Sequence, residues 1–389
     1  MIDICCICKG KANLKAKIFY GEFIQFKDYD YQYISICSKC GFIFTANPLS
    51  LEKTNEYYKT TSRHNYSTIS QTMQHLQRSK KQMSFILDAI EPDDVKTVLE
   101  IGATSGSSLN LFKEKGFNVL GTDLSLSNVN FAKSNFDIDI FHMDFDTFYE
   151  SNNQSFDLIN LSHILEHIIN PHEFIMKIAS INSKYVFIAV PCFDYRYIDT
   201  PYGIFIPTHH SYFTLESLKN LMRASNYRLL DADLLLAGEA QRAAPAYPQI
   251  YSIWEKDIQN CTEVKLPTIS SEQHLDFYIE KCEIQLKWLA SRIDEIPNNL
   301  RLAVWPLGLH TALLYKHTSI GDKNVIKFYD KNSVFYDRKI IGKQVSPFSK
   351  TDAEEQNIEA ILISSYQFQP AILESVKNSG ADFMVITLY

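Results

Sequence analysis

An apolar strand that runs into a glycine turn, followed by a second strand that ends in a carboxylate, constrains this chain most. Residues 98–106 read VLEIGATSG, and Asp123 ends the next apolar run, 21 positions after Gly102. Open α/β sheets build nucleoside pockets in this way, because glycine lets backbone and ligand approach closely and the carboxylate accepts hydrogen bonds from ribose hydroxyls. The turn departs from the dinucleotide pattern G-x-G-x-x-G, since Thr104 holds its middle position. We therefore expect a nucleoside ligand without a pyrophosphate.

The segment from Glu100 to Gly106 resembles the first motif of the class I S-adenosylmethionine (SAM)-dependent methyltransferases. That motif is an apolar strand, then an acidic residue, then a glycine turn, and its middle position is usually glycine where this chain has Thr104. The resemblance implies a SAM pocket in which Thr104 narrows the space beside the methionine part of the ligand. A cofactor-free α/β domain is the alternative, because short glycine motifs match many unrelated chains.

Further strands follow in the order expected of a parallel α/β sheet. Residues 137–143, 156–161 and 185–191 read as the next three strands, separated by helix-length segments. Residues 162–167 lie at the carboxyl end of one of them, where ligands of such sheets bind. The resemblance implies that Asp144, which follows the first of these strands, lies near the adenine. The residues that the resemblance places at the cofactor are Glu100, Gly102, Thr104, Gly106, Asp123, Leu124, Asp144, Phe145, Ser162 and His163.

Two C-x-x-C pairs stand near the start of the chain, Cys5 with Cys8 and Cys37 with Cys40, and Gly41 follows the second pair. They match a tetrahedral four-thiolate site for structural Zn²⁺, in which the protein fills every ligand position. Disulfides are the weaker alternative, because nothing marks the protein as secreted. We interpret Cys6 as a residue that does not bind the metal. Cys192, Cys261 and Cys282 are interpreted as small core residues.

Length and charge narrow the possible functions. A chain of 389 residues with 46% hydrophobic residues can form two or three domains with real cores. The formal net charge of -7 argues against general nucleic-acid binding, which needs a basic face. No apolar run approaches the ~20 residues needed to cross a bilayer, and no charged-then-apolar leader is present. We expect a cytoplasmic protein that acts on a small molecule, with neither nucleic acid nor membrane as a partner.

Two segments outside the strands are candidates for the active site. Residues 57–67 are too polar for a core and precede apolar residues at helical spacing up to residue 90, so they form either a solvated linker or a lid that presents Tyr66 to the substrate. His209 and His210 follow an aromatic loop, and an imidazole suits a catalytic base because it titrates near neutral pH. The alternative is a helix entry with Thr214 as N-cap and the histidines merely nearby.

The C-terminal part reads as a second, smaller Rossmann-like unit. It follows a helix of about residues 271–293. The turn after its first strand has only Gly308, so we do not expect a dinucleotide there. The strands that we expect in this unit cover residues 302–305, 325–329, 360–365 and 383–386.

With its cysteine pairs and C-terminal unit, the chain resembles the sugar C-methyltransferases of deoxysugar biosynthesis over nearly its whole length. That family carries Glu-His, two further residues, an aromatic pair and Ser or Thr; residues 208–214 read THHSYFT, which puts His209 on the catalytic histidine and Thr208 in place of the glutamate. Tyr66 falls near the family's active-site tyrosine, and residues 238–242 echo its Gly-Gly-x-x-Arg segment with one glycine lost.

The resemblance implies a domain order and a reaction. The domains are a zinc-binding domain over residues 1–56, a SAM domain with an N-terminal lid helix over 57–262, and a Rossmann-like substrate domain over 263–389. The reaction is methylation of a carbon in a nucleotide-linked keto-deoxysugar, with His209 as the base. Tyr66 and His210 would donate to the enolate oxygen. Because Thr208 replaces the glutamate, the basicity of His209 depends on another group, or the base lies elsewhere.

Two alternatives remain at the level of function. An O- or N-methyltransferase acting on a sugar or another small metabolite would use the same scaffold, and the missing glutamate favours it. A non-catalytic binding protein with a degenerate SAM pocket is the alternative of another class. Retention of the acidic residues and glycines of the predicted pocket argues against this last alternative.

Overall fold

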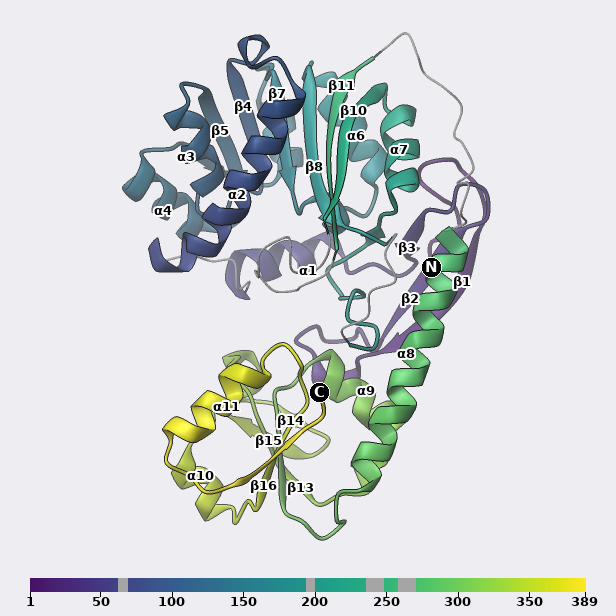
Figure 1. Cartoon of the computed structure of the whole chain (residues 1–389), viewed down its shortest axis with the longest axis vertical. Coiled ribbons are helices and arrows are strands. Elements are labelled where there is room, and N and C mark those ends of the chain that lie inside the picture. The colour runs from purple at the N-terminus through teal and green to yellow at the C-terminus, as the bar shows by residue number, and fades with distance from the viewer. Residues whose placement is uncertain (62–68, 194–199, 236–247, 258–270) are drawn as a thin grey trace. The chain divides into compact units, whose positions relative to one another are not determined.

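The structure is a computed structural model of the chain, and it describes residues 1–61, 69–193, 200–235, 248–257 and 271–389. The chain forms two units, each with a parallel sheet of its own (Figure 1). The first unit holds residues 1–15, 34–197 and 207–275, and the second holds residues 16–33, 198–206 and 276–389. The division into three domains stays a prediction.

The first unit is built on a seven-stranded sheet in the order β10-β11-β8-β7-β4-β5-β6. The five strands from β4 to β8 pair in parallel, as the sequence predicts. The strands β10 and β11 were not predicted, and β11 pairs antiparallel with both β8 and β10. The bounds are β4 (Thr97–Ile101), β5 (Asn118–Asp123), β6 (Ile140–His142), β7 (Leu158–Ser162), β8 (Tyr185–Pro191), β10 (Tyr227–Leu235) and β11 (Gln249–Lys256).

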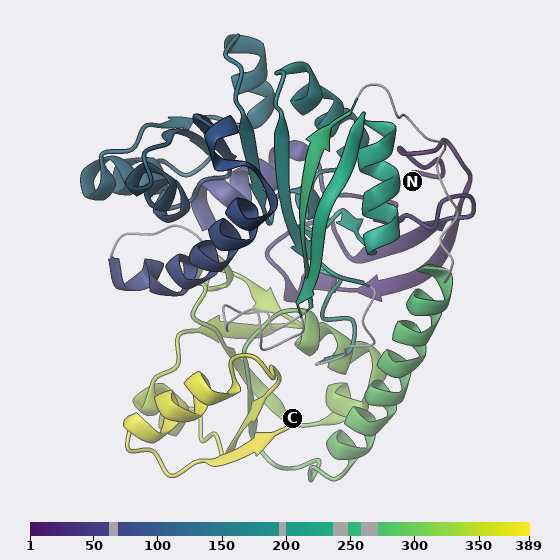
Figure 2. The same cartoon turned by 45° about the horizontal axis from the view of Figure 1, so that its top comes forward.

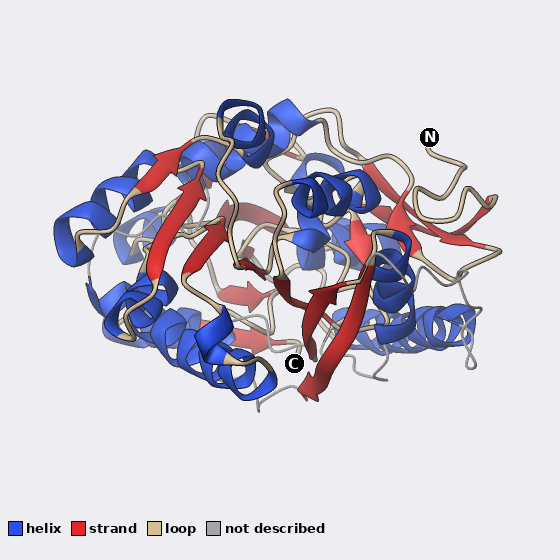
Figure 3. Cartoon of the chain, turned by 90° about the horizontal axis from the view of Figure 1, so that it is seen from above, coloured by secondary structure: helices blue, strands red, loops and turns tan. Residues whose placement is uncertain are grey.

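Helices cover both faces of this sheet (Figures 1 and 3). Alternate residues along the strands point to opposite faces, so the sheet carries two separate apolar cores. One core is shared with α2 (Ile69–Ala89), α3 (Ser107–Glu114) and α4 (Leu126–Phe136). The other is shared with α5 (Phe145–Ser151), α6 (Pro171–Ser180) and α7 (Leu215–Ala224).

Two details of the prediction are wrong in this unit. The apolar residues at helical spacing up to residue 90, which include Met73 and Ile86, were expected to face a core, but Met73 is 51% exposed, whereas Ile86 is fully buried. Thirteen positions at about 100° each place Met73 on the far side of α2 from Ile86. The strand expected over residues 137–143 is shorter, because Asp137 caps α4 with a left-handed backbone (φ 50°).

A four-stranded sheet in the order β1-β2-β3-β9 carries the cysteine pairs and the segment after the histidines. β3 pairs antiparallel with both β2 and β9, so two segments far apart in the sequence are joined by backbone hydrogen bonds. The bounds are β1 (Ala12–Phe19), β2 (Tyr31–Cys37), β3 (Ile43–Thr45) and β9 (Ser211–Tyr212), and α1 (Leu51–Glu56) follows β3.

The second unit has a six-stranded sheet in the order β14-β15-β13-β12-β16-β17. Most of this unit is drawn in green and yellow in Figure 2. All pairs are parallel except β14 with β15, which agrees with the predicted Rossmann-like unit. The strands are β12 (Leu302–Trp305), β13 (Val325–Tyr329), β14 (Lys339–Ile340), β15 (Lys343–Ser346), β16 (Ala360–Ile363) and β17 (Met384–Thr387). The helices are α8 (Ser271–Asp294), α9 (Leu309–His317), α10 (Lys350–Glu355) and α11 (Gln369–Asn378). None of the described helices has both the length and the hydropathy to span a membrane.

Candidate functional site

The turn after β4 has a left-handed backbone at three positions. Gly102, Thr104 and Gly106 have φ angles of 68°, 48° and 75°. Glycine adopts this conformation freely, whereas Thr104 does so at a cost on the order of 1 kcal/mol. A Cβ on Gly102 would lie 2.3 Å from Cδ1 of Ile164, and one on Gly106 would lie 2.8 Å from Cβ of Ala132. The two glycines are therefore required by the packing of the chain itself.

Asp123, at the end of β5, holds this turn in place. Its Oδ2 accepts a hydrogen bond from the backbone N–H of Thr104 (2.8 Å), and its Oδ1 accepts from the backbone N–H of Ser125 (2.8 Å) and from Nδ2 of Asn128 (3.1 Å). Burial raises the pKa of the Asp123 carboxyl, and these hydrogen bonds oppose the rise. A carboxylate has about four lone-pair sites, so one remains for a ligand hydroxyl.

Glu100 lies buried in β4, below the turn. Its Oε1 accepts a hydrogen bond from Nδ2 of Asn160 at 3.0 Å. Its Oε2 is buried and has no hydrogen-bond partner among the described residues. Burial raises the pKa of the Glu100 carboxyl to about 8. Because buried polar atoms are rarely left unpaired, this oxygen is a candidate partner for a polar group of a ligand bound at the turn.

The predicted residues after β6 have structural roles of their own. Asp144 is the N-cap of α5, where its Oδ1 accepts from the backbone N–H of Thr147 at 2.8 Å. Phe145 is buried, and its ring packs edge-to-face on Phe174 with 4.8 Å between centroids. The carbonyl of Leu124 accepts a hydrogen bond from Nε2 of His142 (3.0 Å). Their contact with a cofactor stays a prediction.

Ser162 and His163 lie at the carboxyl end of β7, next to β4 in the sheet. Ser162 exchanges hydrogen bonds with the side chain of Gln82 in α2 (3.0 and 3.1 Å). His163 has a φ of 58°, and its Nδ1 lies 3.1 Å from Oε1 of Glu166. The structure thus brings these two predicted residues to the edge of the sheet that carries the glycine turn.

A cluster of a carboxylate and two imidazoles lies at the same edge. One side-chain oxygen of Glu166 and one ring nitrogen each of His167 and His209 lie within 4.8 Å of one another. The rings of His167 and His209 pack edge-to-face, with centroids 4.8 Å apart. Of these three residues, the sequence analysis selected only His209. The sequence signal for Glu166 and His167 was an acidic residue next to a histidine, a few positions after the end of β7.

Hydrogen bonds set the tautomer of His167. Its Nδ1 lies 2.8 Å from the carbonyl oxygen of Thr208, which can only accept, so Nδ1 carries the proton. The hydroxyl of Tyr58 lies 3.0 Å from Nδ1 and 3.3 Å from Nε2, and in this tautomer only Nε2 can accept a hydrogen bond from it. Burial lowers the pKa of His167, and the charge of Glu166 opposes this.

The backbone of His209, the predicted base, and of His210 is hydrogen-bonded to neighbouring segments on both sides. The hydroxyl of Thr45 in β3 donates to the carbonyl of His209 (2.9 Å), and the N–H of Thr45 donates to the carbonyl of His210 (2.9 Å). The N–H of His210 donates in turn to the carbonyl of Glu166 (2.7 Å). The backbone of the histidine pair is therefore fixed between β3 and the turn after β7.

The other catalytic predictions have different outcomes. His210 is 2% exposed, neither of its ring nitrogens has a partner in the described part of the chain, and burial lowers its pKa to about 3. Tyr66 and residues 238–242 lie outside the described residues. Thr214 caps α7, as the alternative reading expected, and its hydroxyl accepts from the backbone N–H of Ser217 (3.1 Å). A capping role for Thr214 leaves the role of His209 open.

The four paired cysteines come together as predicted. Sγ of Cys5 lies 3.6 Å from that of Cys40, and Sγ of Cys8 lies 3.4 Å from that of Cys37. Four thiolates bound tetrahedrally at 2.3 Å from a zinc ion stand about 3.8 Å apart, so the cluster has nearly the size that the ion needs. Cys6 lies outside the cluster, Cys192 and Cys282 are buried, and Cys261 lies outside the described residues.

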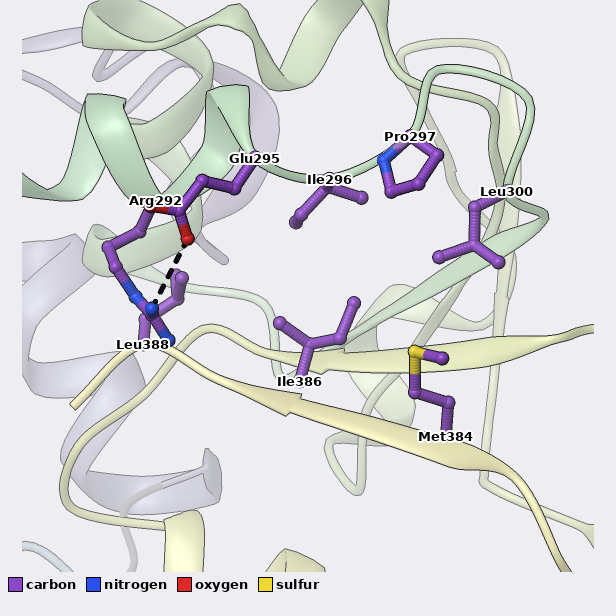
Figure 4. A pocket seen from close by; sticks show the side chains of 8 residues that line it. All are labelled: Arg292, Glu295, Ile296, Pro297, Leu300, Met384, Ile386 and Leu388. Carbon is purple, nitrogen blue, oxygen red and sulfur yellow. Dashed lines mark hydrogen bonds and ion pairs between the residues drawn. The ribbon is translucent and has the colours of Figure 1, made fainter.

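The second unit carries a separate, mainly apolar pocket of about 230 Å³ beside β17 (Figure 4). Arg292 and Glu295 form an ion pair of 3.3 Å at one end of it. The remaining lining residues are Ile296, Pro297, Leu300, Met384, Ile386 and Leu388. This pocket contains no group suited to methyl transfer chemistry.

Residues 73–232 match a family model described as a methyltransferase domain. No curated protein matches the chain. Among solved structures, the chain is similar to magnesium protoporphyrin IX methyltransferase from Synechocystis PCC 6803 with bound SAM, at 13% identity over 54% of this chain and 100% of that chain, with a TM-score of 0.39.

Two further structures show the range of these similarities. One is a SAM-dependent methyltransferase from Archaeoglobus fulgidus, with 18% identity over 47% of this chain and 94% of that chain and a TM-score of 0.35. The other is 1,6-didemethyltoxoflavin-N1-methyltransferase from Burkholderia thailandensis, with 14% identity over 60% of this chain and 98% of that chain and a TM-score of 0.39. Sequence identities and TM-scores this low say nothing about the acceptor substrate.

The matched segment contains the glycine turn, its acidic residues and the parallel strands of the first unit. Residues 73–232 therefore form a methyltransferase domain, and the predicted Rossmann-like α/β fold is confirmed. The residues at the turn fit the cofactor: Glu100 offers a buried unpaired oxygen and Asp123 a remaining lone pair. The match ends at residue 232, before β11, and leaves the flanking segments and the acceptor unassigned.

Proposed function

We propose that the chain methylates a carbon atom of a nucleotide-linked keto-deoxysugar, with His209 as the base. The observation that carries the proposal is the position of the imidazoles. His209 lies within 4.8 Å of Glu166, which follows β7, and β7 pairs directly with β4 and its glycine turn. Ligands of open α/β sheets bind at this edge, so a base there is close to a cofactor held between Glu100 and Asp123.

When bound, SAM supplies an electrophilic methyl group. The chain must then hold the acceptor carbon in line with that group, and such orientation can remove about 7 kcal/mol or more from the barrier. A carbon beside a ketone becomes a nucleophile only after it loses a proton. His209 takes that proton and leaves the electron pair on the enolate, which is a reaction that an imidazole performs well near neutral pH.

We also propose that Cys5, Cys8, Cys37 and Cys40 hold a structural Zn²⁺. In support, their thiols are clustered, and the strand that follows them, β3, binds the backbone of the histidine pair. Metal analysis of the purified chain tests this proposal, with one zinc per chain as the expected result and none as the result that rejects it.

The reaction is tested by hydrogen–deuterium exchange with His209→Asn. We expect wild-type enzyme to exchange the proton beside the ketone of a keto-sugar nucleotide in deuterated buffer, and the variant to do so about 10²- to 10⁴-fold more slowly. His317→Asn, in the second unit, is the matched control and should exchange at the wild-type rate. Unchanged exchange in His209→Asn would reject His209 as the base.

A second candidate is an O- or N-methyltransferase on the same scaffold. The observation that favours it is Thr208, which stands where the sugar C-methyltransferases have glutamate. An oxygen acceptor needs only a base and orientation, because no enolate has to form. NMR of the product made with ¹³C-methyl-labelled SAM separates the two, since methyl groups on carbon, oxygen and nitrogen resonate in different regions.

A further inference from the structure

The residue before the proposed base differs from that of the sugar C-methyltransferases. Thr208 precedes His209, and a hydroxyl cannot supply the negative charge that a glutamate would. An imidazole that accepts a proton becomes a cation, and in a buried site this cation needs a nearby anion. His209 is only 3% exposed, so the anion has to come from the protein or the substrate. The inference below rests on the proposed function of His209.

Glu166 is in the position to supply this charge. Its side chain is 2% exposed, and an oxygen of its carboxylate lies within 4.8 Å of a ring nitrogen of His209. Its Oε1 is engaged by His163 at 3.1 Å, whereas its Oε2 is buried and has no hydrogen-bond partner among the described residues. The backbone carbonyl of Glu166 also accepts from the N–H of His210 (2.7 Å), which ties the main chain at Glu166 to that of the histidine pair.

The groups around the pair favour an ionised Glu166. Burial alone would raise the pKa of its carboxyl, but the hydrogen bond from His163 lowers the pKa below its usual value. Among the described residues, the other titratable groups that face the cluster are His210, the hydroxyl of Tyr58 beside His167, and that of Tyr212, which donates to the carbonyl of His209 at 2.9 Å. Among these groups, Glu166 is the one that carries a negative charge at neutral pH.

We propose that Glu166 is the positioning residue of this site. Its carboxylate, delivered from the turn after β7, orients the imidazole of His209 and stabilises the imidazolium that forms during proton abstraction. It replaces the glutamate that the chain lacks at position 208. In the step itself the C–H bond beside the ketone breaks, its electron pair stays on the enolate, and the proton moves to the imidazole. Glu166 remains ionised throughout and takes no proton.

The test combines loss and relocation of the charge. Glu166→Gln removes the charge and keeps the shape of the side chain, and Glu166→Gln with Thr208→Glu returns a carboxylate from the neighbouring position. We expect Glu166→Gln to slow exchange of the substrate proton about 10- to 100-fold, and the double variant to recover most of the rate. Glu173→Gln, an exposed change in α6, is the matched control and should keep the wild-type rate.

A second readout does not depend on the substrate. NMR titration of chains with ¹³C-labelled histidine follows the His209 resonance, assigned with His209→Asn. We expect the pKa of His209 to fall by about 1 unit in Glu166→Gln and to recover in the double variant. A His209 titration that is unchanged by Glu166→Gln overturns the proposal even if the enzyme methylates a keto-sugar. A shifted titration in an enzyme that accepts no such sugar rejects the substrate and keeps the positioning role.

Two further results complete the test. The same three side chains are of types that bind divalent metals, so a second metal equivalent per chain, lost in Glu166→Gln, would overturn a purely electrostatic role. If Glu166→Gln does not fold, Glu166→Asp takes its place, because it keeps the charge with a shorter reach. The expected exchange rate is then between those of the wild type and His209→Asn, and a rate equal to the wild type contradicts the proposal.

Discussion

In each of the two Rossmann-like sheets, a carboxylate at the end of the second strand accepts hydrogen bonds from the turn that follows the first strand. Asp123 ends β5 and accepts from the backbone N–H groups of Thr104 and Ser125, each at 2.8 Å. Asp330 follows β13 and accepts from those of Leu307 (2.8 Å) and Asn332 (2.7 Å). Burial raises the pKa of both carboxyls. An acid at the end of the second strand therefore braces the turn in both units, with or without a ligand.

The units differ in the first strand. β4 contains Glu100, whose Oε2 has no partner among the described residues, whereas β12 reads LAVW and contains no acid. The turn after β12 is closed by its own chain, because Thr311 and Ser364 both donate to the carbonyl of Pro306 (2.6 and 2.8 Å). The comparison teaches that a carboxylate in the position of Asp123 is common to both turns, and that the buried Glu100 with its unpaired Oε2 is what sets the first turn apart.

Glu100→Gln should have the largest effect. The pKa of Glu100 is about 8 in the folded chain and about 4.3 in an unfolded chain. Between these values the folded chain binds the extra proton, so the free energy of unfolding falls as pH rises, by on the order of 1 kcal/mol per pH unit. The variant should lose this slope and be the more stable protein near pH 8, as measured by urea unfolding across that window. Glu173→Gln, which is exposed, should keep the slope; a slope that survives in Glu100→Gln would contradict the raised pKa.

Asp123→Asn and Asp330→Asn form a matched pair with the next largest effect. Each removes a charged acceptor of two backbone N–H groups, so each should lower the free energy of unfolding by about 1–3 kcal/mol. Only Asp123→Asn should also weaken SAM binding, by about 10- to 100-fold in calorimetry. Equal SAM affinity in the two variants would mean that Asp123 stabilises the turn and does not contact the cofactor.

Gly106→Ala and Gly308→Ala should differ by a smaller amount. Both glycines have positive φ, 75° and 138°, so both variants strain the backbone. A Cβ on Gly106 would meet Cβ of Ala132 at 2.8 Å, whereas one on Gly308 would have no atom within 4 Å. We expect thermal unfolding to show Gly106→Ala about 1 kcal/mol less stable than Gly308→Ala. Equal losses would show that backbone strain alone sets the cost.

Much of the fold was readable from the sequence, because the central strands are continuous apolar runs bounded by turn residues. The predicted bounds of β8, β12 and β13 agree with the structure. β10 and β11 were missed: β10 is an edge strand in which only Tyr227 is buried, and with Asp231 and Asp233 it lacks the apolar run of a central strand. Helix α8 was predicted to within a residue, since its apolar spacing is regular over its length.

The candidate site was less readable, because it is assembled by contacts between distant segments. The glycine turn and Asp123 are local in the sequence and were found. The link from Thr45 to His209 spans 164 residues, and no local pattern announces it. Glu166 and His167 lie in the segment 162–167 that the sequence places at the ligand edge, but they were given no role, because an acid and a histidine after a strand are ordinary until the fold brings His209 beside them.

The antiparallel pairing of β3 with β9 limits how this enzyme can be shortened. A chain trimmed to the matched residues 73–232 would lack β3, whose Thr45 holds the carbonyls of both histidines. It would also lack β11, which lies between β8 and β10 in the sheet. Phe42, whose ring lies 5.6 Å from that of Phe213, would leave an apolar surface bare. We therefore expect a chain trimmed to the matched residues to lose the hydrogen bonds that hold the histidine pair, so the proposed reaction should be studied in the chain with its cysteine-bearing first residues.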